Sequence, residues 1–168
     1  MKSIILIGFM GTGKSTIGRK LAKMKNMRFL DMDFEIEKRE KKTINEIFKN
    51  HGETYFREKE TKLLKEILNL KNTIISTGGG VIESDYNVRL LKKSKNVIWL
   101  DANIDTILNH LENKIEKRPK LKEEKDLKGY IEKLLGKRYK KYEKCSNIKI
   151  SVDNKNIEQV LSDILVYI

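Results

Sequence analysis

Apolar residues along the chain form short uninterrupted runs that alternate with longer amphipathic segments. The clearest run is Ile-Ile-Leu-Ile at residues 4–7, which ends at Gly8. A run without polar positions is typical of a strand that is buried on both faces. Trp99 lies within a similar run and is expected in the core. The same pattern predicts the other strands at residues 28–30, 73–76, 97–100 and 148–152.

Segments with helical spacing of apolar residues separate these runs. The first carries Ile17, Leu21 and Met24 on one face. Thr43 and Glu46 match a capping box, which marks the start of a helix. Helices are therefore expected at residues 14–25, 34–41, 43–50, 53–70, 84–93, 104–114, 127–144 and 157–167.

The alternation of strands and helices predicts an α/β fold class, with three α/β/α layers around a five-stranded parallel sheet. A chain of 168 residues without repeats or low-complexity linkers is expected to form a single domain over residues 1–168. Ligands of such sheets bind at the carboxyl ends of the strands. Residues that directly follow the predicted strands are therefore the first candidates for a site.

Composition excludes several classes of protein. No run of about 18 apolar residues occurs, which argues against a membrane-spanning helix and a membrane partner. The apolar N-terminus leads directly into a glycine-rich loop without a small-residue cleavage site, so a strand is favoured over a signal peptide. Cys145 is the single cysteine and cannot form an internal disulfide, which fits a cytoplasmic protein.

The net charge of +12 raises the question of a nucleic-acid partner, because phosphate backbones attract lysine and arginine. The lysines are interleaved with glutamates, as at residues 35–42 and 58–65, without the aromatic residues that stack on bases. We therefore interpret the charge as a solvated lysine-rich surface, with no nucleic-acid partner. Such a surface would help to attract anionic ligands.

Residues 8–15 match the complete phosphate-binding pattern GxxxxGK[ST], between a predicted strand and a predicted helix. Glycines let successive N–H groups point inward, and the helix N-terminus adds its dipole. Lys14 is expected to bridge the β- and γ-phosphates in a catalytic role, and Ser15 to ligate Mg²⁺. The residues expected to bind ATP here are Gly11, Thr12, Gly13, Lys14, Ser15 and Thr16.

A phosphate-binding loop by itself does not distinguish a kinase from a GTPase, an ATPase or a motor. The chain is too short for the extra domains of most motor ATPases. The nearest approach to a guanine-reading NKxD element is Asn-Lys-Ile-Glu at residues 113–116, which has Glu where Asp is required. Phosphorylation of a small metabolite is the class that remains.

Candidate acceptor residues follow the second and third predicted strands. Asp31 and Asp33 could orient an acceptor hydroxyl, take its proton or lie near Mg²⁺, and one of them could instead only cap the next helix. Three glycines at residues 78–80 permit close approach to a ligand, or form a tight turn without one. Arginines suit carboxylate or phosphate recognition, but spacing does not select among them.

Six motifs in order give the chain a resemblance to the shikimate kinase family over nearly its whole length. They are the phosphate-binding loop, an Asp-x-Asp element, G-E-x-x-F-R-x-x-E, a glycine triplet, R-P-x-L and R-x-x-x-Y. Their positions are residues 8–16, 31–33, 52–60, 77–80, 118–121 and 138–142. The resemblance implies a P-loop kinase fold with a substrate-binding helical segment at about 33–60 and a mobile lid at about 112–126.

The resemblance also implies roles on the acceptor side. Asp33 would hold the acceptor hydroxyl of shikimate as the candidate base. Arg57 and Arg138 would clamp the substrate carboxylate, and Glu60 would orient Arg57. The glycine triplet would bind the substrate, with the Gly79 backbone contacting the ring hydroxyls. The implied substrate-binding residues are Asp33, Arg57, Gly78, Gly79, Gly80 and Arg138.

On the donor side, the resemblance implies that Arg118 moves with the lid and contacts the ATP phosphates as a catalytic residue. Asp31 would lie in the outer sphere of the Mg²⁺ held by Ser15. Lys155 is assigned to the adenine site. Lys120 departs from the family, because this position of the lid is often apolar.

The expected reaction is transfer of the γ-phosphoryl group of ATP to the 3-hydroxyl of shikimate, in aromatic amino-acid biosynthesis, by a monomer. An alternative is another small P-loop kinase that acts on a nucleoside monophosphate or gluconate. The chain lacks the Asp-Gly-[Phe/Tyr]-Pro-Arg element of nucleoside monophosphate kinases. A second alternative is a non-catalytic ATP- or nucleic-acid-binding module. Intact Lys14, Ser15, Asp33 and Arg118 argue against it.

Overall fold

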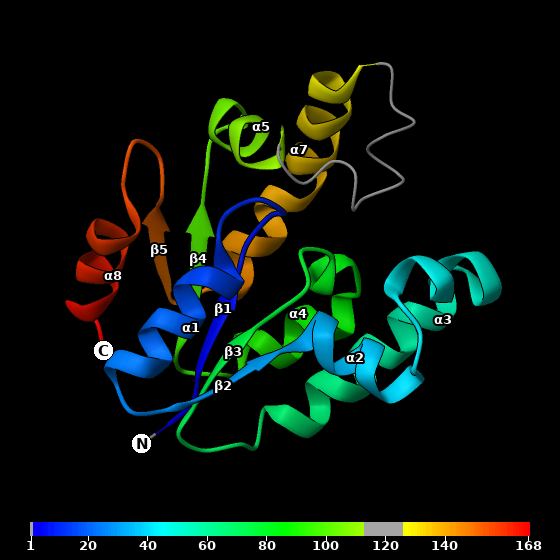
Figure 1. Ribbon diagram of the computed structural model, residues 1–168, viewed down its shortest axis with the longest axis horizontal. Helices are drawn as coiled ribbons and strands as arrows, with labels where there is room; N and C mark the ends of the chain where they lie inside the picture. Colours follow the sequence, from blue (N-terminus) through cyan, green and yellow to red (C-terminus); the bar gives the residue numbers. More distant parts are fainter. Residues whose placement is uncertain (1, 113–125) are drawn as a thin grey trace.

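The computed structural model describes residues 2–112 and 126–168, and its core is a sheet with helices on both faces (Figure 1). The strands are β1 (Ile4–Ile7), β2 (Arg28–Asp31), β3 (Thr73–Ser76), β4 (Val97–Asp101) and β5 (Ile148–Ser151). All neighbours pair in parallel, in the order β2-β3-β1-β4-β5. The predicted five-stranded parallel sheet is therefore confirmed.

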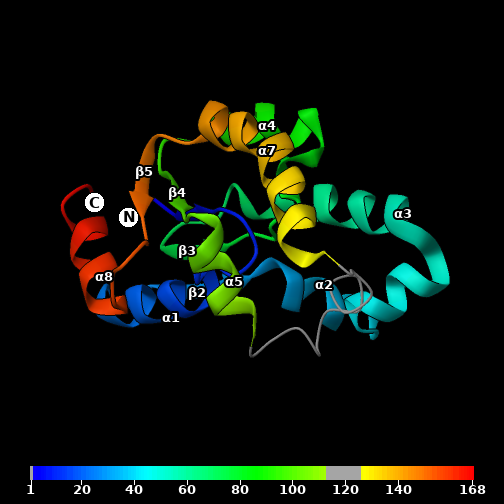
Figure 2. The same ribbon diagram turned by 90° about the horizontal axis from the view of Figure 1, so that it is seen from above.

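The helices form the two outer layers. In Figure 2, α1 and α8 lie on one side of the sheet, and α4 and α7 lie on the other. The described helices are α1 (Lys14–Met24), α2 (Met32–Glu40), α3 (Ile44–Ile67), the short 3₁₀ helix η1 (Val81–Glu83), α4 (Asp85–Lys92), α5 (Ile104–Glu112), α7 (Leu127–Cys145) and α8 (Ile157–Leu165). Within these described residues, no helix combines the length and the apolar character needed to cross a bilayer.

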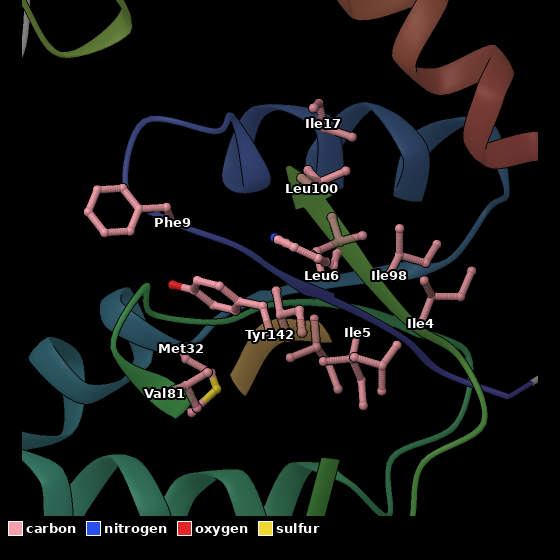
Figure 3. Close-up of a cluster of buried hydrophobic side chains, with 14 of the residues drawn as sticks. Ile4, Ile5, Leu6, Phe9, Ile17, Met32, Val81, Ile98, Leu100 and Tyr142 are labelled. Atoms are coloured by element: carbon pink, nitrogen blue, oxygen red, sulfur yellow. The ribbon is translucent and has the colours of Figure 1, made fainter. Parts of the chain in front are cut away.

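The core lies on both faces of β1 and β4. Ile4 and Leu6 of β1 and Ile17 of α1 lie on one side of the strand, while Ile5 of β1 and Tyr142 of α7 lie on the other (Figure 3). All four residues of β1 are buried, which explains why its sequence contains no polar position. On β4, Trp99 is 1% exposed and stacks on Tyr142 with ring centroids 5.8 Å apart. The predicted core position of this tryptophan is confirmed.

One helix prediction changes in detail, and the predicted break between segments 43–50 and 53–70 is confirmed. Helix α3 spans both segments but is interrupted by a kink at Gly52, whose φ of 80° and ψ of 172° are not helical. The predicted capping box of Thr43 and Glu46 is present at its start. Helix α2 begins at Met32, two residues earlier than expected, because the Asp31 carboxylate caps it and accepts from two backbone N–H groups.

Candidate active site

The phosphate-binding loop connects β1 to α1 in a conformation that needs glycine. Gly8, Gly11 and Gly13 have φ angles of 147°, 81° and 85°, and a Cβ on Gly8 would lie 2.4 Å from the carbonyl oxygen of Leu100. Lys14 is only 8% exposed. Its ammonium donates to the carbonyl oxygens of Gly8 and Phe9, both at 2.8 Å. The loop thus holds a buried ammonium where the sequence predicts the phosphates of ATP.

The remaining loop residues differ in exposure. Thr12 is 1% exposed and its hydroxyl donates to the carbonyl oxygen of Phe9 at 2.9 Å, so it stabilises the loop internally, whereas Thr16 is exposed on α1. A ring nitrogen of His110 on α5 lies 2.7 Å from the carbonyl oxygen of Gly11. Sequence reasoning missed His110, because no motif contains it.

Oxygen atoms of three side chains meet beside the loop. The Ser15 hydroxyl donates to Asp31 Oδ2 at 2.5 Å, and Ser76 Oγ lies 3.3 Å from Ser15 Oγ. Mg²⁺ prefers oxygen ligands and often takes only one or two from the protein, beside water and phosphate. Within residues 2–112 and 126–168, no group of three or more His, Cys, Asp or Glu could hold a metal. The oxygen set therefore fits Mg²⁺ that arrives with a nucleotide.

The glycine triplet after β3 lets charged side chains gather at the carboxyl edge of the sheet. A Cβ on Gly78 would lie 2.7 Å from Asp33 Oδ1 and 2.9 Å from Glu60 Oε1. A Cβ on Gly80 would lie 2.4 Å and 2.5 Å from the two Nη atoms of Arg57. The absent side chains thus leave the space that two carboxylates and one guanidinium occupy.

Arg57, which is half-buried, and Glu60, which is buried, form an ion pair on α3. Arg57 Nη1 donates to Glu60 Oε2 at 2.8 Å, and Nη2 donates to Glu53 Oε1 at 3.1 Å. Glu60 is 1% exposed, and burial raises its pKa to about 7, although the charge of Arg57 opposes the rise. Glu60 Oε1 and Arg57 Nε are buried without a hydrogen-bond partner in the described part of the chain. Such groups are costly and are typical of a site that binds polar ligands.

The raised pKa of Glu60 predicts a pH-dependent stability. As pH rises from 4.5 towards 7, the unfolded chain releases this proton while the folded protein keeps it. The free energy of unfolding should therefore fall by on the order of 3 kcal/mol across this window. Glu60→Gln should remove that contribution. Urea unfolding of both proteins at pH 4.5 and 7.5 measures the free energy of unfolding. If the difference in this free energy between wild type and variant were the same at both pH values, the prediction would be wrong.

Arg138 joins the same cluster from α7. It is 7% exposed, and its Nε donates to Glu83 Oε1 at 2.6 Å. Its guanidinium carbon lies 5.6 Å from the ring centroid of Phe9 in the phosphate-binding loop. Its charge also lowers the pKa of Glu60. Among the arginines of the described residues, only Arg57 and Arg138 are not solvent-exposed, so burial selects the two that spacing could not.

The glycine triplet also touches the phosphate-binding loop. A Cβ on Gly79 would lie 3.1 Å from the backbone nitrogen of Met10. From α7, the Tyr142 hydroxyl donates to the carbonyl oxygen of Gly79 at 2.5 Å. Burial raises the pKa of Tyr142, so its hydroxyl remains a neutral donor. The sequence placed Tyr142 in a motif without giving it a role, and the structure shows that it fixes this turn.

The roles of two predicted site residues, Lys155 and Arg118, stay predictions. Lys155 lies in the loop after β5 and pairs with Asp163 of α8 at 2.8 Å, so its contact with adenine stays a prediction. Arg118 and all but the first and last residues of the predicted lid at about 112–126 lie outside the described residues. The role of Arg118 at the phosphates also stays a prediction.

Comparison with known proteins gives a consistent result. The chain matches the shikimate kinase family over residues 10–168. It is 42% identical to a shikimate kinase of Sulfurihydrogenibium sp. (strain YO3AOP1), over 98% of this chain and 96% of that protein.

Solved structures give the same family. The fold is similar to shikimate kinase from Acinetobacter baumannii in complex with shikimate, with a TM-score of 0.91 and 32% identity over 98% of this chain and 91% of that one. Shikimate kinase from Aquifex aeolicus gives a TM-score of 0.83 at 36% identity, over 98% of this chain and 94% of that one. Sequence and structure together establish that the chain belongs to the shikimate kinase family.

Proposed function

We propose that the cluster around the glycine triplet is the place where this kinase transfers the γ-phosphoryl group of ATP to the 3-hydroxyl of shikimate. Members of this family use ATP with Mg²⁺ in aromatic amino-acid biosynthesis. One observation carries the assignment of the site. The glycine turn contacts the phosphate-binding loop through Gly79, and it contacts Asp33 and Arg57 through its two outer residues. Donor and acceptor groups therefore lie on the two sides of one turn.

On the donor side, Lys14 exchanges its loop carbonyls for the β- and γ-phosphates of ATP. Ser15 would hold Mg²⁺ directly, and Asp31 would hold it through a water molecule. The metal site would then supply positive charge that offsets the negative charge on the phosphates. Backbone N–H groups of residues 11–16 bind phosphate oxygens, Arg118 contacts the phosphates, and Lys155 lies at the adenine.

On the acceptor side, Arg57 and Arg138 grip the carboxylate of shikimate. The bound shikimate of the Acinetobacter baumannii protein supports this choice of ligand. Asp33 accepts a hydrogen bond from the 3-hydroxyl and so points its oxygen at the γ-phosphorus. The Gly79 backbone contacts the ring hydroxyls. The two arginines suit an anionic substrate that has one planar carboxylate.

The chemical step exchanges one bond for another. The 3-hydroxyl oxygen forms a bond to the γ-phosphorus while the bond from that phosphorus to the β,γ-bridging oxygen breaks, and ADP leaves. The hydroxyl proton passes to Asp33 in this proposal. Because phosphoryl transfer is loose, positioning and charge stabilisation supply most of the catalysis.

An acceptor screen tests the proposed reaction. ADP release is followed in a coupled assay with Mg²⁺, ATP and, in separate reactions, shikimate, gluconate or a nucleoside monophosphate. We expect turnover with shikimate and only background rates with the others. Background rates with shikimate from folded protein would end the proposal, and turnover with another acceptor would select the corresponding alternative.

The proposal includes a monomer in the cytoplasm without a membrane or nucleic-acid partner. Among the described residues, the large apolar side chains that are exposed lie at four separate places: Met24 on α1, Phe34 on α2, Tyr86 on α4, and the neighbouring Val166 and Tyr167 after α8. Scattered apolar residues of this kind are normal on a monomer. Light scattering on the purified protein measures its mass in solution.

A further inference from the structure

We propose that Glu83 is a positioning residue that sets the guanidinium of Arg138 for the substrate carboxylate. This inference rests on the proposed function, in which Arg138 is one half of the carboxylate clamp. Glu83 belongs to none of the six sequence motifs, and only the fold brings it to Arg138, 55 residues further along the chain.

Glu83 is attached to the glycine turn of the acceptor site. It is the last residue of η1, and its backbone N–H donates to the carbonyl oxygen of Gly80 at 2.9 Å. Its carboxylate accepts from Arg138 Nε at 2.6 Å. The pair links the turn that contacts Arg57 to the helix that carries Arg138. A shift of Glu83 would therefore change the distance between the two clamp arginines.

The atom that Glu83 binds decides its role. A guanidinium is planar and can present two parallel N–H groups to a carboxylate. Glu83 pairs with Nε and so does not occupy the edge formed by the two Nη groups, although the Tyr142 hydroxyl also interacts with this guanidinium. The ring of Phe9 lies against the guanidinium, with its centroid 5.6 Å from Cζ, which restricts rotation of the plane. The Glu83 carboxylate and the Phe9 ring together fix the orientation of the Arg138 guanidinium.

A second contact holds the backbone of Glu83. Lys141, one turn after Arg138 on α7, donates to the carbonyl oxygen of Glu83 at 3.0 Å. Lys141 also pairs with Asp85 at 2.9 Å. The side chain and the main chain of Glu83 are thus both attached to α7. Arg57 also has glutamate partners, but it pairs through its Nη groups, with Nη1 donating to Glu60 at 2.8 Å and Nη2 to Glu53 at 3.1 Å.

The opposite role for Glu83 would be competition. If its carboxylate occupied the place of the substrate carboxylate, the ion pair would have to break before shikimate binds. Removing the charge would then strengthen shikimate binding. The use of Nε, rather than the two Nη groups, favours positioning, and the two roles predict opposite signs in one experiment.

Glu83→Gln tests the proposal by steady-state kinetics of the full chain. We expect the KM for shikimate to rise about tenfold, the scale of a lost charge-assisted hydrogen bond. The KM for ATP should stay within about twofold. Glu83 is 39% exposed in its side chain, so this substitution leaves no deeply buried polar group. Asp85→Asn is the matched control, because Asp85 lies on the same segment and pairs with Lys141 instead of Arg138.

Two further measurements separate positioning from a general structural effect. The methyl ester of shikimate lacks the anionic carboxylate, so its binding, measured by calorimetry, should be equal in wild type and Glu83→Gln. In an Arg138→Ala background, Glu83→Gln should cause no additional loss of shikimate affinity, because the residue through which it acts is gone.

Several outcomes would overturn the proposal. The first is an unchanged or lower KM for shikimate in Glu83→Gln. The second is a loss of affinity for the ester equal to the loss for shikimate. The third is that Glu83→Gln lowers shikimate affinity in the Arg138→Ala background as much as it does in the wild type. Wild-type kinetics of Glu83→Gln beside an impaired Arg138→Ala would reject the role of Glu83 alone. Normal shikimate affinity of Arg138→Ala would reject the clamp and, with it, this inference.

Discussion

Replacing Lys14 with methionine should lower kcat by about a thousandfold, on the scale of losing one preorganised donor at the transition state. The side chain is buried inside the phosphate-binding loop and donates to two loop carbonyl oxygens. Methionine has a similar length and no charge. The side chain therefore still packs inside the loop, but the cation that stabilises charge on the transferred group is lost. The coupled ADP assay with saturating shikimate measures the loss.

Lys20→Met is the matched control for this prediction. Lys20 is also on α1, but its side chain is 46% exposed and pairs with Glu158 on α8. Exposed pairs contribute little to stability, so this variant should keep wild-type turnover and fold. Circular dichroism and thermal unfolding check the fold of both variants. If Lys14→Met retained more than a tenth of wild-type kcat, Lys14 would not have the catalytic role proposed here.

The second large effect is expected at Arg57. Arg57→Ala should weaken shikimate binding by about a hundredfold or more, because a buried charge pair loses one partner and the ligand carboxylate loses a bidentate donor. The affinity for ATP should remain within a few-fold. Arg57→Lys keeps the charge without the planar fork, and it should recover only part of the affinity. Calorimetry with each ligand separates the two affinities.

Arg39→Ala provides the comparison for Arg57. Arg39 also pairs with two glutamates, Glu35 and Glu66, but its side chain is 44% exposed and lies on α2. It should bind shikimate as the wild type does. Loss of shikimate affinity in both arginine variants would indicate a general structural effect, and normal affinity in Arg57→Ala would remove Arg57 from the clamp.

Short-range patterns predicted most elements of the fold. The apolar run at residues 4–7, the helical spacing after Lys14 and the capping box at Thr43 each depend on neighbours within a few residues. Their outcome is decided locally, by backbone hydrogen bonding and by burial of one face or two. The start of α2, which differs from the prediction, and the predicted break in α3 have local causes too: the cap at Asp31 and the positive φ of Gly52.

The candidate site was predicted in part. The family resemblance assigned Asp33, Arg57 and Arg138 as site residues, and the structure brings all three to the glycine turn. Spacing by itself could not separate these arginines from the exposed ones. Ser76 and Glu83 were missed, because a single serine or glutamate carries no signal until its partner is known.

By itself, the sequence of this protein determined the parallel α/β architecture and the phosphate-binding loop, since both are encoded in contiguous residues. The tertiary structure alone decided which charges meet. Its strand order β2-β3-β1-β4-β5 is not the chain order, and it places Tyr142 against Gly79, 63 residues away. Pairings at such separations depend on the packing of whole layers. The environment of Glu60, the orientation of Arg138 and the contact between donor loop and acceptor turn exist only after folding.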